Sequence, residues 1–307
     1  MSPRILFVVA PEADRLRRCL ALAAELAPPA ARCMMLAPPD VSEAVDALGS
    51  EMVLAPATSS DPDALTAAAR EIAFDAAVFD HPGMDNDVRE DIAQGRPWLD
   101  PAEVASPADA LLRSDVSQVR EAALARRGGP VARVLVALGL DDRRALTSKV
   151  VERLRQRYGN LALDVVLGQG APSVKGLSRI AAHDPRLTLH VDVSDTARLT
   201  GWADVGVVAG EAAWEGCALG LPSVILAPRT DAQVEALVPP GAALAVDPAD
   251  NALDQALDRA LVRLITDPTL REAQTAVAAT LTDGLGASRA AAALLAKLEP
   301  RDSLPHP

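Results

Sequence analysis

The clearest chemical pattern in the chain spans residues 202–226 and has the sequence WADVGVVAGEAAWEGCALGLPSVIL. DVGVVA is a short apolar run typical of a buried parallel strand, Gly210 permits a tight turn, and EAAWEGCALG has helical composition before Pro222. Backbone N–H groups and the positive end of a helix dipole at such a turn favour a phosphate or diphosphate. Glu215, one turn further on, is placed to accept the hydroxyls of a ribose. The same pattern also fits a unit that only packs, with Glu215 on a solvated face.

Composition limits the class of partner. The chain has 307 residues, of which 50% are hydrophobic, so it can form one large or two medium globular domains. Its net charge is −12 and its aromatic content only 2%, which argues against nucleic acid as a partner. A small anionic ligand is still compatible, because local N–H groups and a few arginines can overcome the overall field.

Cysteine usage and hydropathy indicate the compartment. Cys19, Cys33 and Cys217 are too few and too scattered for a disulfide framework or a metal cluster, so no metal site is expected. The first apolar run, ILFVVA, is too short for a signal peptide or a membrane span, and no other segment approaches about twenty apolar residues. We therefore expect a cytoplasmic protein without a membrane span.

Strand and helix patterns alternate in the first part of the chain, which predicts a parallel sheet with ligands at the carboxyl ends of its strands. A helix is predicted at 16–27, where leucines recur at helical spacing. From 86 to 109 the sequence is rich in proline and acidic residues without steady periodicity, which predicts a loop. The predicted strands are ILFVVA (5–10), CMMLA near Cys33, EMVLA near Glu51, and AAVFD (76–80).

A second alternating series follows a break at Gly128, Gly129 and Pro130. It contains strands at ARVLVALG, LALDVVLG and LTLHVD, and helices near 144–158, 175–183 and 195–202. We therefore predict an α/β protein with two Rossmann-like domains, whose parallel sheets face each other across a cleft. The predicted boundaries are 1–128 for the first domain, 129–298 for the second, and 299–307 for a flexible tail.

Seven segments occur in an order that resembles one family, the UDP-sugar hydrolases of pseudaminic-acid biosynthesis (PseG), relatives of the MurG-like GT-B glycosyltransferases. They are RCLALAAEL, VFDHPGMD, ALLR, VLVALGLDD, DVVLGQGAP, WADVGVVAGEAAWEGCALGLPSVILAPRTDAQ and LTDGLGASRAAAALLA. The resemblance covers most of the chain and is strongest from 132 to 295. It implies a GT-B fold.

The resemblance also implies a UDP-binding second domain. Ala209 and Gly210 would face the diphosphate, Glu215 would hold the ribose, and Gln233 belongs to a DAQ segment that resembles the family's DNQ. The resemblance implies further binding residues in two places. Gly139 and Asp142 belong to a GGxD-like loop of the second domain, and Asp80 and His81 belong to the first domain.

This chain departs from the family at several of these positions. Leu140 replaces the second glycine of the GGxD loop, and Glu211 places a negative charge where AGGST becomes AGEAA. In the first domain, Arg15 aligns with the family's histidine and Pro82 replaces a tyrosine. An arginine stays protonated and cannot act as a base, so the catalytic residue is unknown. His81 either orients a substrate hydroxyl or caps the DHPG turn.

Three functions stay open at this level. The first is a PseG-like protein of bacterial surface or flagellin glycosylation that hydrolyses a UDP-linked diacetamido-trideoxyhexose, with other flagellin-glycosylation enzymes as possible partners. The second is a GT-B glycosyltransferase, in which an acceptor hydroxyl replaces water. The third is a catalytically inactive nucleotide-sugar-binding or scaffold protein that keeps the fold. A UDP-sugar is the expected ligand, and no cofactor is expected.

Overall fold

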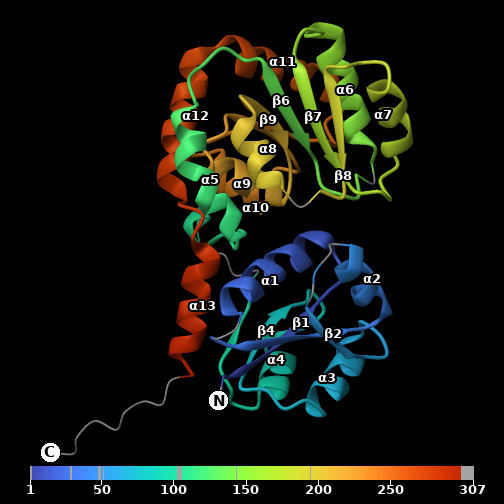
Figure 1. Ribbon diagram of the computed structural model, residues 1–307, viewed down its shortest axis with the longest axis vertical. Coiled ribbons are helices and arrows are strands. Elements are labelled where there is room, and N and C mark those ends of the chain that lie inside the picture. Colours follow the sequence, from blue (N-terminus) through green and yellow to red (C-terminus); the bar gives the residue numbers. More distant parts are fainter. Residues whose placement is uncertain are drawn as a thin grey trace, which may run out of the picture. The chain divides into compact units, whose positions relative to one another are not determined.

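The structure, a computed structural model, describes residues 2–27, 30–47, 50, 52–101, 106–142, 144–193 and 195–298. The chain forms two compact units, each with its own sheet and core (Figure 1). The first unit comprises Met1–Ala105 and Gly286–Pro307, and the second comprises Ser106–Leu285. The predicted cleft between the two sheets stays a prediction.

The first unit contains a five-stranded parallel sheet with the order β3-β2-β1-β4-β5. The central strand β1 is buried on both faces, which explains its continuous apolar sequence. The strands are β1 (Arg4–Val9), β2 (Arg32–Ala37), β3 (Val53–Pro56), β4 (Ala76–Asp80) and β5 (Trp98–Leu99). The helices are α1 (Ala13–Leu26), α2 (Pro39–Ala47), α3 (Pro62–Arg70), α4 (Asn86–Ala93) and α13 (Gly286–Ala296). The predicted strands are confirmed, except that Glu51 lies outside the described residues and β3 begins at Val53.

The loop predicted for 86–109 is wrong. The helix α4 begins where Asp85 accepts a hydrogen bond from the backbone N–H of Val88 at 3.0 Å, and β5 follows it. Ile92 is buried in the core, and Trp98 meets Phe79 edge to face with ring centroids 5.9 Å apart. A few apolar side chains at the right spacing therefore anchor this segment although most of its residues are polar or proline.

The second unit contains a six-stranded parallel sheet with the order β11-β10-β9-β6-β7-β8. The strands are β6 (Arg133–Ala137), β7 (Ala162–Leu167), β8 (Leu187–Val191), β9 (Val205–Val208), β10 (Ser223–Leu226) and β11 (Leu244–Val246). The helices are α5 (Ser114–Ala125), α6 (Leu146–Arg157), α7 (Val174–Ala181), α8 (Thr196–Trp202), α9 (Glu211–Ala218), α10 (Ala232–Leu237), α11 (Leu253–Thr266) and α12 (Pro268–Leu281). The predicted second series of strands and helices is confirmed, and its strands share one apolar core with α6 and α11.

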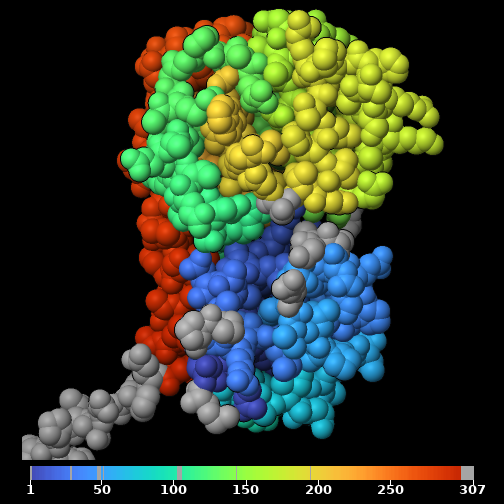
Figure 2. Space-filling model, in the orientation of Figure 1, coloured from blue at the N-terminus to red at the C-terminus, as the bar shows by residue number. Residues whose placement is uncertain are grey.

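The boundary between the units differs from the predicted 128/129, because α5 packs on α8 and α9 within the second unit (Figures 1 and 2). Arg120 donates hydrogen bonds to the carbonyl oxygens of Ala218 at 3.0 Å and Ala279 at 2.7 Å. Arg127 donates to the carbonyl of Leu219 at 2.8 Å, and burial lowers the pKa of this arginine to about 10. These side chains neutralise the negative ends of helices and hold α5 in place.

The last helix also differs from the predicted division. α13 packs against α1 in the first unit, where Ser288 Oγ donates to Glu25 Oε2 at 2.7 Å (Figure 1). The chain therefore returns to the first unit after completing the second. Within the described ranges, no helix combines the length and the apolar character that crossing a membrane requires.

Candidate functional site

The carboxyl edge of the second sheet holds the turn that the sequence singled out. β9 ends at Val208, Ala209 N–H donates to the carbonyl of Ala137 at 2.9 Å, and α9 begins at Glu211. Gly210 adopts φ 58° and ψ −138°, a backbone conformation that side-chain-bearing residues rarely take. Gly210, the N-cap residue of α9, has no side chain that could cap the helix. The turn therefore has the geometry expected of an anion-binding helix start.

Glu215 is buried at this site rather than solvated. It is 1% exposed, and Thr196 Oγ1 donates a hydrogen bond to its Oε1 at 3.0 Å. Arg113 Nη2 lies 3.8 Å from the same oxygen and donates to Thr196 Oγ1 at 3.1 Å. The interpretation of Glu215 as a solvated surface residue is therefore wrong. A ribose that uses this carboxylate must share it with Thr196 and Arg113 or displace them.

Arg113 brings a positive charge to the start of α9. Its guanidinium donates to both carboxylate oxygens of Asp115, at 3.1 and 2.8 Å. Burial alone lowers the pKa of Arg113, but Asp115, Glu215 and Glu211 outweigh burial and raise the pKa above its ordinary value. The arginine therefore stays charged, and it offsets part of the negative charge that Glu211 brings to this turn.

The loop between β6 and α6 lies at the same edge, because β6 pairs with β9. Gly139 has φ 95°, and a Cβ added to it would meet no atom within 4 Å. Asp142 is 7% exposed and holds the loop together: its Oδ1 accepts from Thr147 N–H at 3.2 Å, and its Oδ2 accepts from Ser173 Oγ at 2.5 Å. Asp142 therefore acts on the shape of the loop.

Leu140, which departs from the GGxD pattern of the resemblance, packs through its side chain. Its side chain contacts the apolar cluster that also includes Ala212 in the first turn of α9. Its carbonyl accepts a hydrogen bond from Gly168 N–H at 2.9 Å, and a Cβ on Gly168 would lie only 3.0 Å from that oxygen. Among the described residues of this loop, the positive φ values fall at Gly139, Asp142 and Ala145, so Leu140 carries no strain of that kind.

Gln233 lies in the first turn of α10, the helix that follows β10. Asp231 caps this helix by accepting from Gln233 N–H at 3.0 Å. Gln233 Oε1 is buried and has no hydrogen-bond partner among the residues that the structure describes. The loops that carry Gly139, Gly210 and Gln233 thus follow β6, β9 and β10, which are neighbours in the sheet.

In the first unit, Asp80 is the last residue of β4 and is fully buried. Its carboxylate accepts hydrogen bonds from Arg15 Nη1 at 2.7 Å, from Arg18 Nη2 at 2.6 Å, and from Arg18 Nε. Arg15 is thus half of a guanidinium pair around one carboxylate. Burial and the charge of Asp80 also raise the pKa of the neighbouring Cys19 thiol well above its ordinary value.

His81 has both ring nitrogens engaged. Nδ1 accepts from Gly83 N–H at 3.2 Å, so Nε2 carries the ring proton and donates to the carbonyl of Ser60 at 3.0 Å. A Cβ on Gly83 would lie 3.3 Å from the ring, which explains a glycine here. This arrangement is that of a histidine that caps the DHPG turn.

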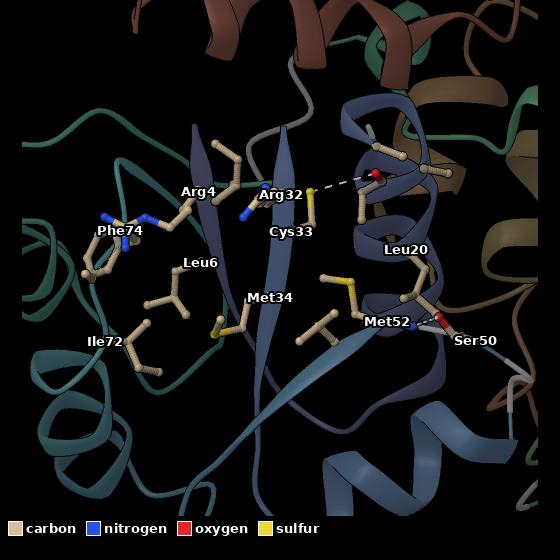
Figure 3. Close-up of a pocket in the computed structure, with 16 residues that line it drawn as sticks. Arg4, Leu6, Leu20, Arg32, Cys33, Met34, Ser50, Met52, Ile72 and Phe74 are labelled. Carbon is tan, nitrogen blue, oxygen red and sulfur yellow. Dashed lines mark hydrogen bonds between the residues drawn. The ribbon is translucent and has the colours of Figure 1, made fainter. Parts of the chain in front are cut away.

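A cavity of about 600 Å³ lies at the opposite edge of the first sheet, near the amino ends of β1 and β2 (Figure 3). Leu6, Met34 and Phe74 line it on one side of β2, and Cys33 and Leu20 on the other. Burial raises the pKa of Cys33 to about 11. This apolar cavity is remote in the fold from Asp80, which ends β4 at the carboxyl edge.

Two residues of the candidate site, Arg113 and Thr196, were not predicted from the sequence. Arg113 belongs to the ALLR segment, whose match to the family pointed to it without giving it a role. Thr196 gave no signal, because threonine at a helix start is common. Its contact with Glu215 joins residues from separate parts of the chain, and only the fold brings them together.

The sequence matches no known family model and no curated protein. Solved structures match over nearly their whole length. They include the glycotransferase of kitacinnamycin (19% identity, TM-score 0.66, 97% of this chain and 100% of that chain). MurG of Acinetobacter baumannii has 14% identity and a TM-score of 0.64 over 95% of this chain and 99% of that chain. The spinosyn rhamnosyltransferase SpnG complexed with thymidine diphosphate has 14% identity and a TM-score of 0.60, over 97% and 100%. The fold of the chain is therefore GT-B, as predicted.

Proposed function

We propose that this chain is a GT-B glycosyltransferase that takes its sugar from a nucleoside diphosphate. The second unit would hold the nucleotide of the donor, and the first unit would hold the acceptor. The observation that carries this proposal is the turn at Gly210, which starts α9 beside the end of β9 and leads to Glu215 one turn later. Structural neighbours named as glycosyltransferases support transfer over hydrolysis.

The diphosphate would bind at the start of α9. Ala209 and Gly210 supply backbone at close approach, and the helix dipole stabilises negative charge there. As the donor bond breaks, charge develops on the leaving diphosphate, so this turn would stabilise the transition state as well as the ground state. Arg113 adds a fixed positive charge near the same turn.

Ribose, loop and base contacts complete the proposed donor site. Glu215 would accept ribose hydroxyls, and Gln233 offers an amide whose oxygen lacks a partner among the described residues. Gly139 leaves room for the ligand next to its loop, and Asp142 keeps that loop in shape. The base is uracil by the family resemblance, whereas SpnG was solved with thymidine diphosphate, so both nucleotides belong in the test.

The hydrolase of the resemblance is the second candidate. It shares the proposed donor site, but its mechanism depends on the histidine that Arg15 replaces, and Arg15 lies in an ion pair with Asp80. His81 supplies no substitute base in this arrangement, because both its nitrogens form hydrogen bonds. Flagellin-glycosylation partners and a cytoplasmic location stay predictions that accompany this candidate.

Calorimetric titration with UDP and TDP tests the donor site. We expect binding of at least one nucleotide. Glu215→Gln should weaken this binding about tenfold, because the two ribose hydroxyls would then meet a neutral amide in place of a charged carboxylate. Glu235→Gln on the exposed side of α10 is the matched control and should change affinity less than about twofold. Failure of both nucleotides to bind would contradict the proposal.

Nucleotide release then separates the candidate functions. Release from a UDP- or TDP-sugar only when an acceptor alcohol is present supports transfer. Release at the same rate with and without the acceptor alcohol would favour the hydrolase. Binding without release under either condition would favour the inactive nucleotide-sugar-binding protein.

A further inference from the structure

We propose that Arg15 and Arg18 form a subsite for an oxyanion, a carboxylate or a phosphate, on the ligand of the first unit. This deepens the proposed function and rests on it for treating that ligand as the acceptor. Both arginines lie in the first two turns of α1, and both bind Asp80 at the carboxyl end of β4. Carboxyl ends of parallel strands are where such sheets bind ligands.

Asp80 fixes the position of the two guanidinium groups. It is fully buried, and it accepts hydrogen bonds from Arg15 Nη1 at 2.7 Å and from Arg18 through Nε and Nη2. Two long side chains held in this way lose little conformational freedom when a ligand binds. Asp80 therefore positions the arginines, although it does not face the ligand itself.

Among the buried groups around this pair, guanidinium groups outnumber carboxylates. Asp100 also acts on Arg18 electrostatically, but it is paired with Arg89 at 2.8 Å. Glu12 lies 3.3 Å from Arg15, and its side chain is 54% exposed, so solvent screens that pair. The three partly buried guanidinium groups thus face two buried carboxylates, Asp80 and Asp100.

Both arginines keep donors for a further partner. Arg15 Nη2 and Arg18 Nη1 have no hydrogen-bond partner among the described residues, and both side chains are 27% exposed. Guanidinium N–H groups recognise carboxylates and phosphates through paired, charge-assisted hydrogen bonds. The positive end of α1 adds to the attraction. The role of this charged pair is binding rather than proton transfer, because an arginine stays protonated.

Nuclear magnetic resonance of the full-length protein can follow the arginine Nε–Hε signals directly. The probes are glucuronate, glucose 6-phosphate and, as the neutral control, glucose. We expect the signals of Arg15 and Arg18 to shift and saturate with at least one anion, and not with glucose. The anion that binds identifies the carboxylate or the phosphate as the preferred group. Equal shifts with glucose, or no shift with either anion, would overturn the subsite.

Variants test whether the charge must lie at this place. Arg15→Gln should weaken anion binding about fivefold or more, and Arg15→Lys should fall between it and the parent because a lysine lacks the planar fork. Arg70→Gln removes the same charge from an exposed ion pair with Asp91 and should leave affinity unchanged within about twofold. An equal loss in Arg70→Gln would show a general field effect and overturn the subsite. Arg15→Lys carries the test if Arg15→Gln does not fold.

Titration with UDP and TDP separates this inference from the proposed function. Nucleotide binding without anion binding refutes the subsite and leaves the donor site standing. Anion binding without nucleotide binding supports the subsite as a binding site of the first unit and refutes the donor site.

Discussion

Thr196 and Glu215 are joined by a 3.0 Å hydrogen bond between the start of α8 and the second turn of α9. The bond gives a buried carboxylate a fixed orientation, since Glu215 is 1% exposed and Arg113 lies 3.8 Å from the same oxygen. A donor site that uses Glu215 is therefore organised before any nucleotide arrives, and its carboxylate is part of the packing of the second unit.

We expect Thr196→Val to destabilise the second unit by about 2 kcal/mol, because the buried carboxylate of Glu215 loses the hydroxyl group that donates a hydrogen bond to it. Urea unfolding followed by circular dichroism measures the change. Thr188→Val, an exposed position on β8, is the matched control and should stay within about 0.5 kcal/mol of the parent. Equal effects of the two substitutions would show that the contact with Glu215 contributes nothing.

Asp80→Asn should destabilise the first unit by about 3 kcal/mol, because it leaves two partly buried guanidinium groups without their shared counter-charge. Asp91→Asn breaks an ion pair whose side chains are both 54% exposed, and we expect a loss below about 1 kcal/mol. Urea titration of both variants provides the comparison. A loss for Asp80→Asn as small as that for Asp91→Asn would contradict the buried charge cluster.

Gly210→Ala should destabilise the second unit by about 1–3 kcal/mol and weaken nucleotide binding, because an alanine strains at φ 58° and ψ −138°. Gly216→Ala lies inside the same helix, where a new Cβ would meet Leu221 at an ordinary 3.8 Å. It should be neutral or stabilising by up to about 1 kcal/mol. Thermal unfolding and calorimetry measure the two effects, and similar behaviour of both variants would remove the special role of Gly210.

The acid dependence of stability should involve Asp164. Burial alone raises its pKa, but hydrogen bonds from His190 at 2.8 Å and Arg133 at 2.6 Å outweigh burial and lower the pKa below 3.8. Because the folded-state pKa is the lower one, the stabilisation is present above the unfolded-state value and is lost as pH falls through the folded pKa.

Asp164→Asn should therefore be less stable than the parent at pH 7, and the gap should shrink as pH falls below about 4. Urea unfolding at neutral and acidic pH measures this gap. Asp195→Asn, at an exposed ion pair with Arg198, should show a small gap at every pH. A gap for Asp164→Asn that does not change with pH would contradict the lowered pKa.

The division of the chain can be tested with fragments. A fragment of residues 106–285 keeps α5 on α8 and α9 and should fold, as judged by circular dichroism and a cooperative melt. A fragment of 129–298 lacks α5 together with Arg120 and Arg127, so the apolar surface that α5 covers on α8 and α9 becomes exposed. We therefore expect this fragment to aggregate or to melt at a lower temperature. Equal stability of the two fragments would favour the boundary at 128/129.

Much of the fold follows from local sequence. Apolar runs such as ILFVVA and LALDVVLG must be buried on both faces of a sheet, and their alternation with helical segments leaves few topologies other than doubly wound parallel sheets. The turn at Gly210 was also evident, because its glycine interrupts the strand-to-helix pattern at the position that requires a positive φ. These features depend on neighbours along the chain, so periodicity and residue type are enough to predict them.

Other features depended on partners distant in sequence. Nothing local indicates that Arg15 binds Asp80, that Thr196 binds Glu215, or that α5 belongs to the second unit, since each contact joins segments that only the folded chain brings together. The amino acids alone therefore determined the α/β architecture and the edge of each sheet where the candidate site residues lie. Tertiary packing decided which charges are paired and buried there, because the cost of burying a charge depends on what surrounds it in space.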